Sequence, residues 1–110
     1  MRRILLPWLA TLSVAVMLLF APIAGAQGKT AMVNIQNIAF NPPNMTVAPG
    51  TTVTWVNNDQ VNHTVTADNG TFNSGILPPG QRFSHTFKKA GTYAYHCNIH
   101  SSMRGTVTVR

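Results

Sequence analysis

The sequence predicts an all-β protein, an antiparallel sandwich or a small barrel of short strands, behind an N-terminal export signal. Two observations support this fold class: short runs in which apolar and polar residues alternate, and Pro, Gly and Asn clusters that separate these runs. After residue 26, no segment has the length and period of a helix that would connect parallel strands. Short strands at this spacing are typical of two packed sheets.

The first 26 residues have the pattern of a secretory signal peptide. Met1–Arg3 is a short positive start, Ile4–Ile23 is an almost unbroken apolar run, and Ala24-Gly25-Ala26 supplies small residues for cleavage. We expect cleavage after Ala26, which leaves one domain of residues 27–110. An uncleaved membrane anchor is the alternative, and two prolines in the run and the small-residue site disfavour it.

The expected strands share a pattern in which large apolar or aromatic side chains fall on one face of a sheet. They are Ala31–Gln36, Thr52–Val56, Gln81–Lys88, Thr92–Cys97 and Thr106–Val109. The expected turns are Asn41–Asn44, Ala48–Gly50, Asp68–Gly70 and Pro78–Gly80. In the Gln81–Lys88 run, His85 shares a face with two phenylalanines, so we expect it at the edge of the core.

The charge of the chain gives little support for nucleic-acid binding. The formal net charge is +6, and Arg2 and Arg3 belong to the signal, so residues 27–110 carry +4. The remaining basic residues are scattered, with no Lys or Arg run and no interleaved aromatic residues. This balance fits solubility and attraction to acidic partner proteins, which raises association rates.

Cys97 is the chain's single cysteine, in a protein expected to be exported. It has no disulfide partner within the chain, and an unpaired thiol in an oxidising compartment should be buried, reactive or bound to a metal. Removing 26 of the 110 residues leaves 84, a size at which a metal often supplements a thin core. The lone thiol is therefore a first indication of a metal site.

The segment YHCNIHSSMRG, Tyr95–Gly105, places His100 three residues after Cys97 and Met103 six residues after it. A strand that ends at Cys97 and a turn with two serines and a glycine would bend these side chains toward one point. A thiolate with imidazole suits zinc or copper, whereas two His, one Cys and a weak axial Met describe an electron-transfer copper centre. Such a centre requires one more histidine.

Three histidines are candidates for that position. His96 is adjacent to Cys97 on the same strand, so its side chain should point to the opposite face of the sheet. His85 has the expected core role given above. His63 lies in a polar loop after the Trp55 strand and is free to face the end of a sandwich.

The segments GTYAYHCNIHSSMRGTVTV and TVTWVNNDQVNHTV resemble the cupredoxins, the small blue copper proteins, and most closely their amicyanin and plastocyanin-like branch. The resemblance covers about Met32 to Val109. It rests on the strand-borne Cys, the C-x2-H-x2-M loop of amicyanin length and the upstream His followed by a strand. It implies a Greek-key β-sandwich with one copper ion per chain. The implied close ligands are His63, Cys97 and His100, with Met103 as a long axial ligand.

The resemblance also implies a function. A protein of this kind shuttles single electrons between redox partners by Cu(I)/Cu(II) cycling and is not an enzyme, since four protein ligands leave no open position for a substrate. His100 is implied as the entry point for electrons. Transient partners such as a dehydrogenase or a cytochrome would dock near it, on an apolar patch for which Pro42, Pro43, Ile99 and Met103 are candidates. We expect a periplasmic monomer without stable membrane insertion after cleavage.

Thr64 departs from the family pattern. Amicyanins and plastocyanins usually carry Asn directly after the upstream ligand His, where its side chain tethers the Cys loop. A threonine hydroxyl can make a shorter version of that tether. Because hydrogen bonds around a metal site orient its ligands, this change bears on the reduction potential and the loop stiffness rather than on the ligands themselves.

Three other functions remain as alternatives. Copper storage or delivery usually relies on exposed, exchangeable ligand clusters, unlike a closed set on a compact β scaffold. Catalysis by Cys97 with a histidine base would need an open cleft and an orienting third group. Zinc in the same pocket would gain nothing from the thioether. Reversible redox chemistry of bound copper distinguishes electron transfer from storage.

Overall fold

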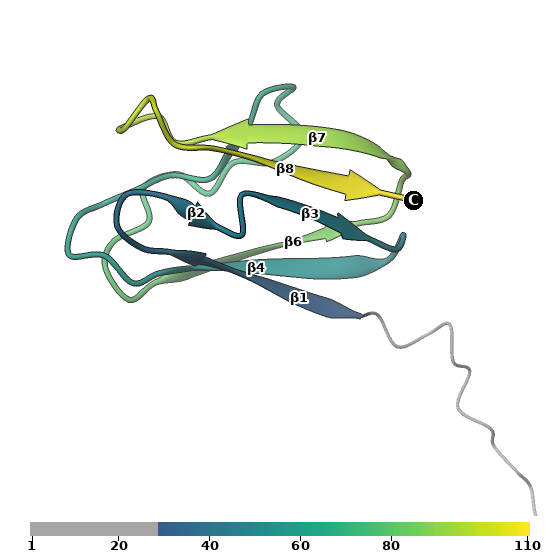
Figure 1. Cartoon of the computed structure of the whole chain (residues 1–110), viewed down its shortest axis with the longest axis horizontal. Coiled ribbons are helices and arrows are strands. Elements are labelled where there is room, and N and C mark those ends of the chain that lie inside the picture. Colours follow the sequence, from purple (N-terminus) through teal and green to yellow (C-terminus); the bar gives the residue numbers. More distant parts are fainter. Residues whose placement is uncertain (1–28) are drawn as a thin grey trace, which may run out of the picture.

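The structure is a computed structural model that describes residues 29–110 (Figure 1). The predicted signal peptide, residues 1–26, lies outside the described residues. The strands are β1 (Thr30–Ile35), β2 (Phe40–Asn41), β3 (Asn44–Val47), β4 (Thr51–Asn57), β5 (Thr66–Ala67), β6 (Arg82–Phe87), β7 (Gly91–His96) and β8 (Arg104–Val109). In this part of the chain there are no helices, and so none that is long and apolar enough to cross a bilayer.

The strands form two sheets that pack face to face. One sheet has the order β2-β1-β4-β6 and the other has the order β3-β8-β7-β5. In Figure 1, β7 and β8 lie above β1, β4 and β6. The predicted all-β sandwich is confirmed.

Two strand pairs differ from the antiparallel arrangement that the sequence predicts. β1 pairs with β4 in parallel, with Val33 opposite Trp55, and β3 pairs with β8 in parallel, with Met45 opposite Val107. The chain leaves β1 through the short β2, crosses to the other sheet as β3 and returns as β4 beside β1. Alternation reports which face of a strand is buried and says nothing of the neighbouring strand's direction, so the sequence pattern could not reveal these pairs.

The core lies between the sheets around the Trp55 side chain. Its ring centroid lies 5.3 Å from that of Tyr95 and 5.7 Å from that of Phe72. Both residues flanking Trp55 on the same face of β4, Val53 and Asn57, are also buried, as alternation requires. Offset and edge-to-face aromatic pairs of this kind each add roughly 0.5–1.5 kcal/mol beyond area burial.

The β7–β8 pair positions the segment that carries Cys97. Gly105 on β8 lies directly opposite Tyr95 on β7, and a Cβ atom at Gly105 would stand 2.3 Å from Cζ of the Tyr95 ring. The tyrosine ring therefore lies directly on the Gly105 backbone, and no residue with a Cβ atom would fit at position 105. The two strands are joined by residues 97–103, the yellow-green loop at the upper left of Figure 1.

Candidate metal centre

The loop between β7 and β8 is closed at its base by a hydrogen bond. The Cys97 amide donates to the Met103 carbonyl at 3.2 Å, and the Met103 amide donates to the His100 carbonyl at 3.0 Å. These bonds fold the segment back on itself, as its short spacing required. Cys97, His100 and Met103 are thereby held in one tight turn at the end of the sandwich.

His63 reaches the same place from the long connection between β4 and β5. Its backbone is fixed by a pair of hydrogen bonds with Leu77: the His63 amide donates to the Leu77 carbonyl at 3.1 Å, and the Leu77 amide donates to the His63 carbonyl at 2.8 Å. The Asn57 side-chain amide also donates to the Leu77 carbonyl, at 2.9 Å. The backbone of His63 is therefore tied to Leu77, and Leu77 in turn is tied to Asn57 at the end of β4.

The structure brings the sulfur of Cys97 and one nitrogen of each histidine together. The Sγ atom lies 3.8 Å from Nδ1 of His63 and 3.9 Å from Nδ1 of His100, and all three atoms lie within 4.8 Å of one another. Metal–nitrogen and metal–sulfur bonds of roughly 2.0–2.3 Å, opened to a trigonal angle, place nitrogen and sulfur about 3.8 Å apart. The spacing therefore fits one first-row metal ion between these atoms.

Met103 completes the group, and water is largely excluded from it. The Met103 sulfur lies near His63. The exposed fractions are 0% for His63, 1% for Cys97 and 2% for Met103, whereas His100 is half-buried. A thiolate, two imidazoles and a thioether form the donor set of an electron-transfer copper site, in which the thioether is a weak axial ligand. The donor chemistry thus favours copper over zinc.

The surroundings of Cys97 favour its thiolate form, which is the form that binds metals. Burial raises the pKa of the thiol, but hydrogen bonds from backbone amides, first those of His100 and Thr64 and then that of Ile99, outweigh this effect and lower the pKa to about 6. The Thr64 and Ile99 amides each lie 3.4 Å from the sulfur. The site is therefore prepared for a cation before one binds.

Thr64 provides the tether that its position suggested. Its hydroxyl oxygen accepts a hydrogen bond from the Asn98 amide at 2.8 Å, and its own amide donates to the Cys97 sulfur. One residue thus ties the connection that carries His63 to the loop that carries the other donors. The shorter threonine side chain spans this gap without help from Asn62, which is exposed.

The other two histidines are placed as the sequence predicted. His96 points away from the sulfur and makes hydrogen bonds with Asp68, at 2.5 Å from Nδ1, and Asn98, at 2.9 Å from Nε2. His85 packs between Phe72 and Phe87, with ring centroids 4.8 and 4.7 Å away. Neither belongs to the group around Cys97.

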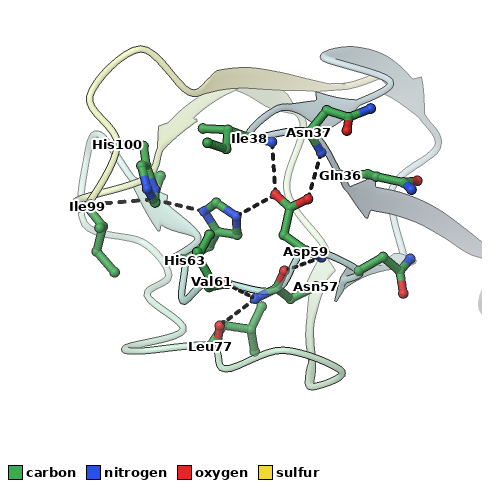
Figure 2. A network of polar contacts seen from close by, with 12 residues as sticks. Gln36, Asn37, Ile38, Asn57, Asp59, Val61, His63, Leu77, Ile99 and His100 are labelled. Carbon is green, nitrogen blue, oxygen red and sulfur yellow. Dashed lines mark hydrogen bonds and ion pairs between the residues drawn. The ribbon is translucent and has the colours of Figure 1, made fainter.

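Asp59 is a residue of this site that the sequence reasoning missed, because it was counted only as a charge. Figure 2 shows its carboxylate between His63 and the amides of Asn37 and Ile38. The Oδ2 atom of Asp59 lies 2.8 Å from Nε2 of His63. Burial raises the pKa of Asp59, but hydrogen bonds from Ile38, His63 and Asn37 outweigh this and hold it below its usual value. A separation of four residues gives no signal in an irregular loop, so only the fold could reveal this contact.

Comparison with known proteins places the chain in a family. The cupredoxin-like domain matches residues 9–109. The chain belongs to the cupredoxin family. This cupredoxin is 36% identical to the plastocyanin of Scenedesmus fuscus over 86 residues, which cover 66% of this chain and 88% of that protein.

Amicyanins are similar to this cupredoxin as well. The amicyanin of Paracoccus denitrificans is 37% identical over 83 residues, which cover 71% of this chain and 63% of that protein. Among solved structures, a methionine-to-alanine mutant of amicyanin in its Cu(I) form has a TM-score of 0.70 and 34% identity, over 74% of this chain and 82% of that one. Copper, which the donor set favours, is thus the cofactor expected of this cupredoxin and of its amicyanin and plastocyanin-like branch.

Proposed function

We propose that this cupredoxin is a small exported blue copper protein that carries single electrons between redox partners. Copper would be held by His63, Cys97 and His100, with Met103 as a weak axial ligand. The observation that carries the proposal is the Cys97 sulfur with two imidazole nitrogens at 3.8 and 3.9 Å, in a group of which His63 and Cys97 are buried and His100 is half-buried. The bound ion supplies one-electron chemistry by alternating between Cu(I) and Cu(II).

The protein's own residues make this exchange easy. His63 is fixed through its backbone, and Cys97 and Met103 are fixed by the loop hydrogen bonds, so the donors have little freedom to rearrange. A site held between the geometries preferred by the two oxidation states changes little on redox. The four donors leave no open position for a substrate, which supports electron transfer rather than catalysis.

His100 is the proposed route for electrons, because it is the one donor that is only half-buried. Ile99, which precedes it in the chain, is 45% exposed, and the two prolines that the sequence offered for the patch, Pro42 and Pro43, are exposed as well. Met103, which the sequence offered as a candidate for the apolar patch, is 2% exposed and cannot contribute to a surface. A small apolar contact around an imidazole suits the weak and brief encounters of redox partners.

The cellular setting of the protein is part of the proposal. Cleavage after Ala26 would release a monomeric domain of residues 27–110 into the periplasm. Its net charge of +4 would favour partners with acidic surfaces, such as a dehydrogenase or a cytochrome. Removal of the predicted signal is tested by N-terminal sequencing of protein recovered from the periplasm, which should begin at Gln27.

The visible absorption spectrum of the Cu(II)-loaded protein tests the function. We expect an intense blue band that ascorbate bleaches and ferricyanide restores, and that is missing in Cys97→Ser. If folded, copper-loaded protein shows no such band, the four donors do not assemble around copper as proposed. Copper that binds tightly but does not cycle reversibly would instead indicate storage or delivery.

A further inference from the structure

The carboxylate of Asp59 is the point where three hydrogen bonds converge. The Asn37 amide donates to Oδ1 at 2.7 Å, the Ile38 amide donates to Oδ2 at 2.9 Å, and His63 Nε2 lies 2.8 Å from the same Oδ2 (Figure 2). The amides come from the loop after β1 and lie more than twenty residues away along the chain. This carboxylate therefore links the β1–β2 loop to a proposed metal ligand.

The β1–β2 loop adopts an unusual backbone to make these contacts. Asn37 has φ 57° and Ile38 has φ 53°, and this left-handed region is a genuine outlier for a β-branched residue. Backbone of this kind persists where the surrounding structure holds it, often at functional sites. Here it aims two successive amides at the two oxygens of one carboxylate. The unusual backbone of this loop therefore serves to fix the Asp59 carboxylate.

Asp59 is also held from its own side. Its amide donates to the Asn57 side-chain oxygen at 2.9 Å, while the Asn57 side-chain nitrogen donates to the carbonyls of Val61 and Leu77 at 2.8 and 2.9 Å. Asn57 is fully buried. The carboxylate is consequently fixed in position by both loops that flank it.

This arrangement decides where the proton of His63 lies. An ionised carboxylate only accepts hydrogen bonds, so His63 Nε2 must donate and carry the proton. In neutral imidazole the other nitrogen, Nδ1, then has the free lone pair. That nitrogen is the one 3.8 Å from Cys97 Sγ. The ring is therefore set to offer the correct atom to a metal before the metal arrives.

We propose that Asp59 is a positioning residue that fixes the tautomer and ring plane of His63 and makes this imidazole a stronger donor to Cu(II) than to Cu(I). The proposal rests on the proposed copper function. A histidine ligand whose second nitrogen donates to a carboxylate is more basic and better oriented, and loss of such a partner typically costs 10–100-fold in metal affinity. A more basic ligand stabilises the higher charge, so Asp59 should lower the reduction potential.

The Asp59→Asn variant inverts part of this network without changing its shape. Its amide has one oxygen and one NH2 group, so in either orientation the NH2 group faces at least one N–H donor. The chain also provides a matched control, Asp68→Asn. Asp68 likewise pairs with a histidine, His96, but that ring points away from Cys97. Both substitutions remove one negative charge from an Asp–His pair.

The first experiment needs no copper, and its decisive measurement is made on the wild-type protein. Long-range 1H–15N NMR of the metal-free protein should show His63 protonated at Nε2. In Asp59→Asn the Nδ1-protonated form should appear, while Asp68→Asn should leave His63 unchanged. An Nδ1-protonated His63 in the wild-type protein would overturn the proposal, whether or not the variants fold.

The second experiment compares the copper-loaded proteins. Asp59→Asn should lose 10–100-fold in Cu(II) affinity and less in Cu(I) affinity. Each tenfold loss of Cu(II) affinity relative to Cu(I) affinity raises the midpoint potential by 59 mV. Asp59→Glu, which keeps the charge, should restore part of the shift, and Asp68→Asn should show little. A folded Asp59→Asn protein with wild-type potential and affinity contradicts the proposal. Wild-type protein without a blue band would instead refute the copper function, and the NMR result would still decide the role of Asp59.

Discussion

Replacing Gly105 by alanine adds one methyl group at the tightest contact between β7 and β8. The new Cβ atom would lie 2.3 Å from Cζ, 2.4 Å from Oη and 2.8 Å from Cε1 of Tyr95. Tyr95 is 1% exposed, and its ring packs edge-on against Phe40 at 4.7 Å and Trp55 at 5.3 Å. The ring must therefore move, and it moves into an occupied core.

The size of the effect follows from these distances. A carbon–carbon contact is favourable from about 3.5 Å, so the Tyr95 ring has to shift by roughly 1 Å. Overpacking of a core costs typically 1–3 kcal/mol. Complete loss of an aromatic pair costs about 0.5–1.5 kcal/mol, and here two such pairs are weakened. We expect Gly105→Ala to lower the free energy of unfolding by about 2–3 kcal/mol, which in a domain of this size lowers Tm by roughly 10–20 °C.

Thermal unfolding of the metal-free protein, followed by circular dichroism, measures this loss. The contact with Tyr95 is isolated by repeating the substitution in a Tyr95→Leu background, where the ring is gone and Gly105→Ala should cost less than about 1 kcal/mol. The reasoning fails if Gly105→Ala alone changes stability by less than about 0.5 kcal/mol, the range of ordinary surface substitutions. It fails equally if the cost is the same in both backgrounds.

Two further predictions concern the loop around the thiolate. Thr64→Val keeps the shape of the side chain but leaves the Asn98 amide without its acceptor, which should cost about 0.5–1.5 kcal/mol and speed hydrogen exchange at that amide. Unchanged Asn98 protection would disprove the tether. In the metal-free protein, ultraviolet titration of the Cys97 thiolate should give a pKa of about 6, below the ordinary 9.0. Between these pH values the Cys97 thiol is protonated in the unfolded chain and ionised in the folded protein. The free energy of unfolding should therefore rise with pH from 6 to 9, and the stabilisation by the thiolate should be absent below pH 6. Cys97→Ser should lack this rise, and an equal rise in that variant would contradict the assignment.

Much of the sandwich was visible in the sequence because each strand reports its own buried face. Alternation placed Val33 and Trp55 inside, and His85 at the edge of the core, without knowledge of their neighbours. The parallel pairing of β1 with β4 was not visible, since a strand's pattern is the same whichever way its neighbour runs. β3 was missed because it begins directly after two prolines, which favour a turn.

The candidate site also contains residues that the sequence indicates and residues that only the fold reveals. Cys97, His100 and Met103 are close along the chain, so their spacing alone indicates that they meet. His63 came from the family resemblance, and its place beside the sulfur depends on the bridge to Leu77. Asp59 could not be anticipated, because its role depends on amides at Asn37 and Ile38 that only the folded chain brings near it.

The hydrogen bond from the Cys97 amide to the Met103 carbonyl has a consequence for how such a protein can diversify. It closes the segment that holds three of the four proposed donors into a self-contained loop, and the strands on either side continue as an ordinary hairpin. Insertions or exchanges between these two residues would alter the spacing of the donors while the two sheets keep their packing. Substitutions in this short loop can thus change the metal site while the rest of the chain keeps its fold.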